Sequence, residues 1–102
     1  MTKDEIYNTI EAVKEWGRER GINNPTRQLN KTIEEIGELA HEICRDHFDS
    51  QEFRDSIGDV LVTVILLADM TGNDPMECLA EALQEISHRT GITSNGMFIK
   101  SL

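Results

Sequence analysis

The segment DSIGDVLVTVILLADM, residues 55–70, decides the fold of this chain. Residues 60–68 are apolar except for Thr63, so apolar side chains point to nearly every side of a helix there. Asp59 stands directly before this run, and Asp55 lies one helical turn earlier. A helix that is apolar all round must be covered, either by other helices of the chain or by another chain. The two acids therefore mark either a solvated helix start or a buried site whose charge is compensated.

Start and stop signals divide the chain into helices around this segment. Asn24 before Pro25, and Asp74 before Pro75, each pair an N-cap residue with a proline at the first helical position. The predicted helices span residues 2–20, residues 25–47, a stretch capped by Ser50 that ends before Gly72, and a stretch from Pro75 that stops at Gly91. The tail carries only the turn signal Asn95-Gly96. We expect one all-α, four-helix bundle-like domain over residues 1–102.

Charge and length limit the classes of partner. The chain has 102 residues, with 10 Lys and Arg against 19 Asp and Glu, which gives a net charge of -9. This charge repels nucleic acid polymers and anionic membranes, and no apolar run is long enough to span a bilayer. We expect a cytoplasmic protein without a nucleic acid or membrane partner. The apolar run at residues 60–68 predicts a homo-oligomer, either a dimer or a tetramer, because three other short helices cannot cover it.

Carboxylates recur on one side of the helix predicted over residues 25–47. The side opposite its apolar stripe carries Lys31, Glu35, Glu38 and Glu42. Taken alone, this pattern is typical of a solvated face. In the following helix, however, the side that bears Asp59 continues as apolar residues, so its carboxylate must be covered. Two acidic helix faces packed together repel strongly unless a cation lies between them.

The chemistry of these side chains indicates which cation. Oxygen ligands without accompanying His or Cys favour a hard ion, most simply Mg²⁺, with Mn²⁺ as a substitute. Mg²⁺ binds through carboxylates together with substrate phosphates. We therefore interpret Asp59 as a metal ligand at the base of a pocket.

Two motifs carry a resemblance to a known family. EEIGEL at residues 34–39, followed by DSIGDVLV at residues 55–62, resembles the EExxE and ExxD signature of the MazG-like nucleoside triphosphate pyrophosphohydrolases, which are all-α proteins. The similarity spans nearly the whole chain, and the C-terminal part resembles the phage-type branch. The further matches are Trp16, Arg20-Gly21, Gln28, Lys31, HRTG at 88–91 and NGMFIK at 95–100.

The resemblance implies Mg²⁺-dependent hydrolysis of a nucleoside triphosphate between its α and β phosphates. We expect a deoxynucleotide, while the base, the sugar and the biological role (house-cleaning, pool control or signalling) stay open. In the family pattern Glu35, Glu38 and Asp59 are metal ligands, and Glu34 orients or deprotonates the attacking water. The implied substrate contacts are Lys31, Arg89 and Lys100 for the phosphates, and Asn95 near the sugar or base.

The chain departs from the family pattern at one metal ligand. Ser56 occupies the position, three before Asp59, where the family usually has Glu. Asp55 lies about 40° from Asp59 around the helix and restores the fourth carboxylate, so we expect it to replace that ligand. Glu52, one turn further out, is the reserve candidate.

Two other functions fit parts of the sequence. Glu38 with His41, and Glu85 with His88, have the ExxH spacing of di-iron helical bundles, although these helices are short for such a bundle. The other alternative is a non-catalytic helical interaction module whose acids form a solvated surface. Metal analysis and assays of pyrophosphate release distinguish these alternatives from a nucleotide hydrolase.

Overall fold

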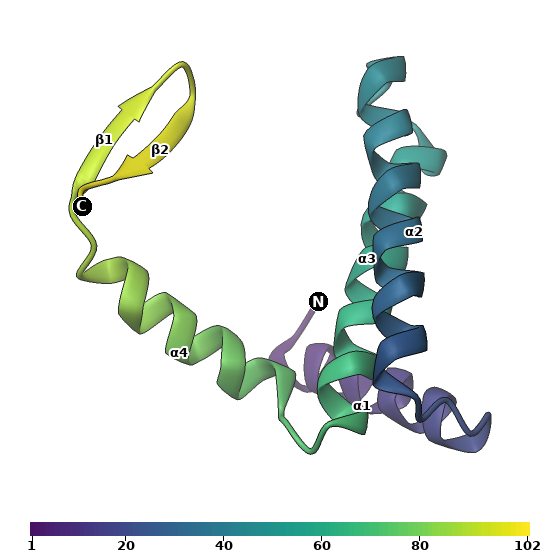
Figure 1. Ribbon diagram of the computed structural model, residues 1–102. Coiled ribbons are helices and arrows are strands. Elements are labelled where there is room, and N and C mark those ends of the chain that lie inside the picture. Colours follow the sequence, from purple (N-terminus) through teal and green to yellow (C-terminus); the bar gives the residue numbers. More distant parts are fainter.

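The computed structural model describes residues 1–102 and contains the four predicted helices followed by a β-hairpin (Figure 1). The elements are α1 Lys3–Glu19, α2 Pro25–Arg45, α3 Gln51–Met70, α4 Pro75–Ser87, β1 Gly91–Ser94 and β2 Met97–Lys100. The all-α prediction is confirmed, and the hairpin is a small addition to it. None of the helices combines the length and apolar character that a membrane crossing requires.

Side-chain caps fix where each helix begins. The side chain of each cap residue accepts a hydrogen bond from a backbone N–H group of the first turn. The pairs are Thr2 with Glu5, Asn24 with Arg27, Ser50 with Phe53, and Asp74 with Met76 and Glu77. Each cap satisfies N–H groups that have no partner within the helix. The end of α4 differs from the prediction, because the helix stops at Ser87 and Gly91 already belongs to β1.

Helices α2 and α3 lie side by side and pack through the polar side of α2 (Figure 1). The buried residues on the two helices are Gln28, Thr32 and Glu35 of α2, and Ser56, Thr63 and Leu66 of α3. Gln28 Nε2 donates to the Thr63 carbonyl oxygen at 3.1 Å, and Thr32 Oγ1 donates to the Gln28 carbonyl oxygen at 3.0 Å. The apolar stripe of α2 therefore faces outward, and Ile33 is 58% exposed.

Helix α1 approaches α3 closely at Gly17. A Cβ atom on Gly17 would lie 2.5 Å from Leu66 Cδ2, closer than real Cβ contacts come. Leu66 is 5% exposed and is the only buried residue with a large apolar side chain. The missing side chain of Gly17 thus lets α1 cover the one apolar core position.

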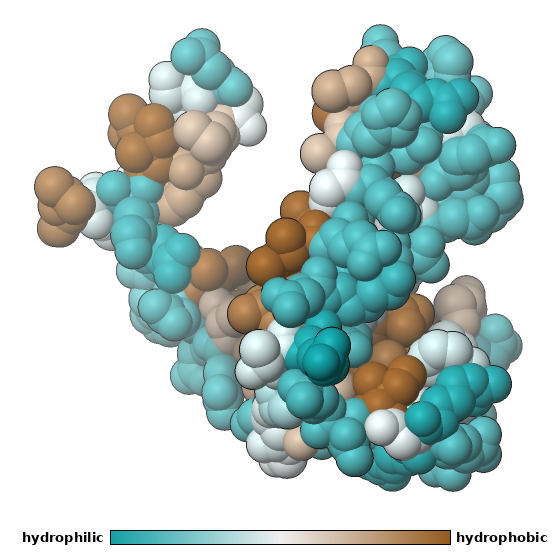
Figure 2. All heavy atoms as spheres, turned by 45° about the vertical axis from the view of Figure 1, so that its right-hand side comes forward, coloured by the Kyte–Doolittle hydropathy of each residue, from teal (hydrophilic) through white to brown (hydrophobic).

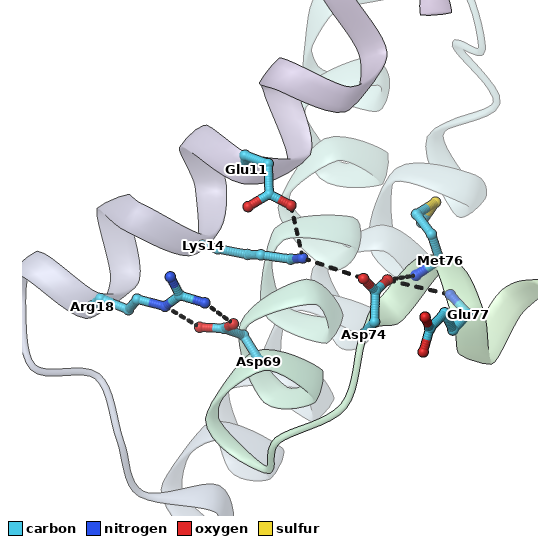
Figure 3. Close-up of polar contacts among 7 residues, drawn as sticks. All are labelled: Glu11, Lys14, Arg18, Asp69, Asp74, Met76 and Glu77. Carbon is cyan, nitrogen blue, oxygen red and sulfur yellow. Dashed lines mark hydrogen bonds and ion pairs between the residues drawn. The ribbon is translucent and has the colours of Figure 1, made fainter. Parts of the chain in front are cut away.

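Ion pairs join α1 to the corner between α3 and α4 (Figure 3). Arg18 Nε donates to Asp69 Oδ2 at 2.9 Å, and the same guanidinium also reaches Oδ1. Lys14 Nζ, which is buried, lies 3.0 Å from Glu11 Oε1 and 3.8 Å from Asp74 Oδ2. Asp74 accepts hydrogen bonds from the backbone N–H groups of Met76 and Glu77, and these bonds lower the pKa of its carboxyl. The positive charge of Lys14 lowers this pKa further, to a smaller extent. These contacts hold the first turn of α4 in place.

Beyond that first turn, α4 and the hairpin extend away from the other three helices (Figure 1). The hairpin strands are antiparallel and contact only each other. Asn95 at φ 52° and Gly96 at φ 75° form the two-residue turn, which is the conformation that an Asn-Gly hairpin turn requires. The radius of gyration is 15.9 Å, against about 13 Å for a compact domain of this length. The single chain is therefore open.

Gly17→Ala should destabilise the protein by about 1–3 kcal/mol, because the new methyl group overpacks the contact between α1 and Leu66. Leu66→Ala alone should cost about 2–5 kcal/mol. The double variant should cost less than the sum, since the shortened side chain at position 66 makes room for the methyl group added at position 17. Urea unfolding of the four proteins measures this coupling, and additive costs would show that the two positions do not meet.

Candidate carboxylate site on α2 and α3

Three glutamates of α2 bring their carboxylates together. Oxygen atoms of Glu34, Glu35 and Glu38 lie within 4.8 Å of one another. We call these three residues the glutamate cluster. The pKa of the Glu38 carboxyl is raised, chiefly by the negative charge of Glu35. The cluster is thus a region of like-charge repulsion in which Lys31 pairs with Glu34 and Glu35, and Glu38 has no ion-pair partner.

Glu35 is the member of the cluster that the fold buries. The residue is 8% exposed, and its Oε2 atom is buried without a hydrogen-bond partner. Its Oε1 atom lies 3.4 Å from Lys31 Nζ, which is equally close to Glu34 Oε1. These two acids, Glu34 first, raise the pKa of Lys31. Because buried carboxylate oxygens are normally paired, Oε2 points to a ligand that binds here.

Asp59 of α3 faces the same cavity as Glu35. Both residues line a cavity of about 250 Å³ together with Lys31 and Gln28. Asp59 also lines a neighbouring cavity of about 560 Å³, whose other walls come from α1 and Val62. The sequence predicts that Asp59 is covered at the base of a pocket, but within the single chain its side chain is exposed. The reason is that the Asp59 side chain borders the two cavities instead of packing directly against α2, as its neighbours Ser56 and Thr63 do.

The residues considered for the fourth ligand lie in different surroundings. Asp55 is exposed and accepts a hydrogen bond from Gln51 Nε2 at 2.7 Å. Ser56 is buried, and Glu52 is exposed in the first turn of α3. The glutamate cluster includes none of the three.

The predicted substrate contacts divide into two groups. Lys31 lies at the glutamate cluster, whereas Arg89 lies in the link after α4, and Asn95 and Lys100 lie in the hairpin. Arg89 pairs with Glu85 at 3.3 Å, and Lys100 forms no ion pair. The hairpin contacts no helix, so the chain does not bring these cations to its own glutamate cluster.

Helix α1 contributes a wall that the ligand motifs do not predict. Trp16 lines both cavities, and the guanidinium carbon of Arg20 lies 4.4 Å from the centre of its ring. Gln28 of α2 is another residue that the ligand motifs do not predict. It is buried, and its hydrogen bond to the Thr63 carbonyl oxygen holds the start of α2 against α3. Its signal in the sequence is its spacing from Thr32 and Glu35, which places three polar residues on one side of a helix.

The donor atoms suit a hard divalent ion. Every acid at the site offers oxygen, and neither His nor Cys lines the cavity. The di-iron alternative requires the ExxH pairs of α2 and α4 to meet, but these helices do not contact each other. His88 Nδ1 instead lies 2.9 Å from the Gln84 carbonyl oxygen. The two ExxH pairs therefore do not form one centre within this chain.

Carboxylates on two packed helices, beside a cavity with an apolar wall, define a class of all-α proteins that handle a cation together with a ligand. The model of the MazG nucleotide pyrophosphohydrolase domain family matches residues 23–91, and the chain belongs to this family. The match covers α2, α3 and α4 and therefore the whole glutamate cluster. No curated protein and no solved structure shows significant similarity to the chain.

Family membership identifies the protein as a nucleoside triphosphate pyrophosphohydrolase, a hydrolase that acts on acid anhydrides. It also indicates a divalent metal cofactor, which agrees with the all-oxygen donor set. The resemblance based on the two acidic motifs is thus confirmed, and a non-catalytic interaction module is not needed to explain the acids.

Glu38→Gln should raise the melting temperature of the metal-free protein, because it removes a negative charge that faces Glu35. A divalent ion should raise the melting temperature of the wild type and have a smaller effect on this variant. Thermal unfolding with EDTA and with Mg²⁺ checks both expectations. Glu42→Gln is the control, since Glu42 already pairs with Arg45 at 3.7 Å. A lower melting temperature for metal-free Glu38→Gln would contradict the repulsion.

Proposed function

We propose that the protein hydrolyses a nucleoside triphosphate between the α and β phosphates and releases the monophosphate and pyrophosphate. The observation that carries this proposal is the buried, unpaired Oε2 atom of Glu35 inside a carboxylate cluster, with Asp59 across the cavity. Such an arrangement is costly for a protein that binds only water there. It suits a protein that binds a cation and a phosphate chain together.

The metal in this proposal is Mg²⁺, with Mn²⁺ as a substitute, held by Glu35, Glu38, Asp59 and Asp55. When bound, the ion neutralises phosphate charge and favours attack by water. Glu34 is exposed at the edge of the cluster, where its Oε1 atom lies 3.4 Å from Lys31 Nζ, and in this proposal its carboxylate orients the attacking water or accepts its proton.

The proposed substrate lies with its phosphates at the metal and its nucleoside along α1. Lys31 Nζ, 3.4 Å from two cluster acids, supplies a cation at the phosphate side. The cavity of about 560 Å³ is large enough for a nucleoside, and Val13, Trp16 and Val62 give it an apolar wall. This wall offers few partners for a 2′-hydroxyl group, which favours a deoxynucleotide.

We further propose that the enzyme is a homo-oligomer. A folded chain of 11.6 kDa is expected to expose about 5,800 Å², whereas this chain exposes 7,940 Å², about 2,100 Å² more. The apolar stripe on the outer side of α2 is part of this excess, namely Leu29, Ile33, Ile36 and Ile43. Association buries such a stripe.

Activity should require a divalent ion. Pyrophosphate release from a panel of nucleoside triphosphates should be lost in excess EDTA and return with Mg²⁺. Asp59→Asn should abolish turnover and leave thermal stability unchanged or higher, because Asp59 is unpaired in the metal-free protein. Glu15→Gln, an exposed acid on α1, is the control and should keep the wild-type rate. Full turnover in EDTA would refute the metal requirement.

Asp55 should contribute more to catalysis than Ser56, because a carboxylate offsets the charge of the ion and a serine hydroxyl does not. Asp55→Ala should lower the turnover number at least about a hundredfold, or about 2.7 kcal/mol in the barrier. Ser56→Ala should lower it by less than about tenfold. The reverse order in the measured rates would place Ser56, rather than Asp55, in the ligand set.

A further inference from the structure

Lys31 is the only cationic side chain that lines the cavity beside the glutamate cluster. Its Nζ atom lies 3.4 Å from Glu34 Oε1 and 3.4 Å from Glu35 Oε1, so one ammonium group is shared between two acids. Both distances exceed the roughly 2.7–2.9 Å of a strong charge-assisted hydrogen bond. Lys31 therefore offsets part of the negative charge of the cluster without binding tightly to either acid.

Lys31 occupies a carboxylate that a bound cation also needs. It pairs with Glu35 Oε1, while the other oxygen of this carboxylate, Oε2, is buried and has no partner. An ammonium group only donates hydrogen bonds and offers no lone pair, so Lys31 cannot take part in binding an ion. It also repels a divalent cation that approaches the same carboxylate. In the free protein Lys31 and a divalent ion therefore compete for Glu35.

The Lys31 side chain is able to leave these acids without unpacking the fold. It is 51% exposed, whereas the side chain of Glu35 is 11% exposed. In Figure 2 most of the surface over the α2–α3 pair is hydrophilic. A lysine carries its charge at the end of a long, flexible stem. The ammonium group is thus the mobile partner of the ion pair, and the Glu35 carboxylate is the fixed one.

The phosphate chain of a bound nucleotide offers Lys31 new partners in the same cavity. Phosphate oxygens accept charge-assisted hydrogen bonds from an ammonium group. Because no other cation lines this cavity, a triphosphate there attracts Lys31 first. Transfer of Lys31 to the phosphates leaves Glu35 to the ion and Glu34 to the attacking water. Both acids become available in one step.

We propose that Lys31 is an internal counter-ion that holds Glu34 and Glu35 in the free protein, and that nucleotide binding transfers it to the phosphates. The contact in the free protein is autoinhibitory, because it weakens cation binding and occupies the proposed base until substrate arrives. The transfer rests on the proposed function, whereas the competition with the cation does not.

Cation binding by the nucleotide-free protein tests the competition. Lys31→Met removes the charge but keeps a good helix former, so it should bind Mn²⁺ about tenfold more tightly than the wild type in calorimetry. Arg27→Met is the matched control, because it removes a positive charge one turn earlier on α2, at an exposed position outside this cavity. Its affinity for Mn²⁺ should stay within about twofold of the wild type at physiological salt. Equal affinities for wild type and Lys31→Met, or equal gains for both variants, would overturn the proposal.

The same titrations with a bound nucleotide analogue test the transfer. The α,β-methylene analogues of the common deoxynucleoside triphosphates replace the bridging oxygen at the proposed cleavage position. The gain of Lys31→Met in Mn²⁺ affinity should disappear with analogue bound, because wild-type Lys31 then lies on the phosphates. Comparing proteins in identical solutions cancels the chelation of Mn²⁺ by the analogue.

A lysine that stays at the acids changes Mn²⁺ affinity by the same factor with and without analogue. That result would overturn the transfer and leave the proposed function intact. If no analogue binds and no nucleoside triphosphate is hydrolysed, the proposed function and the transfer both fail, while the first titration still decides the competition.

Discussion

Burial of the Glu35 carboxylate between α2 and α3 is the constraint on which the rest of the structure depends. Gln28 and Thr32, on the same side of α2, find backbone partners, whereas Glu35 Oε2 finds none. Replacing such a group with an apolar residue would commonly stabilise a fold. The helix pair instead keeps a buried carboxylate oxygen without a protein partner, at the position where we propose that a cation binds. Local stability is commonly lower at functional sites of this kind.

The same packing explains why the single chain is open. Because α2 turns its polar side toward α3, its apolar stripe faces outward, and only Leu66 of the large apolar residues is buried. The single chain therefore buries little apolar area for a domain of this length, which is the observation that supports the proposed homo-oligomer. The ion pairs of Lys14 and Arg18 fix the corner where α4 begins, so α4 leaves the other helices in a defined direction (Figure 3). The burial of Glu35 and the outward position of the apolar stripe both follow from which side of α2 packs against α3.

Local signals made most of the fold predictable from the sequence, and long-range packing did not follow from them. Caps such as Asn24 and Asp74 act within one turn, so the helix starts were predicted correctly. The cluster at Glu35 and Glu38 follows from helical periodicity alone. Asp59 was expected to be covered because α3 is apolar on nearly every side, but periodicity does not say how closely α1 and α2 approach it, and in the single chain its side chain is exposed. The strands have four residues each, too few for a reliable alternating pattern, although Asn95-Gly96 marks their turn.

Electrostatics links the cation and the nucleotide in the proposed enzyme. A chain of net charge -9, with three carboxylates within 4.8 Å, repels a free triphosphate. A divalent ion reverses the sign of this interaction locally, and a phosphate chain in turn supplies oxygen ligands that the protein lacks. Each ligand therefore raises the affinity for the other by the same factor.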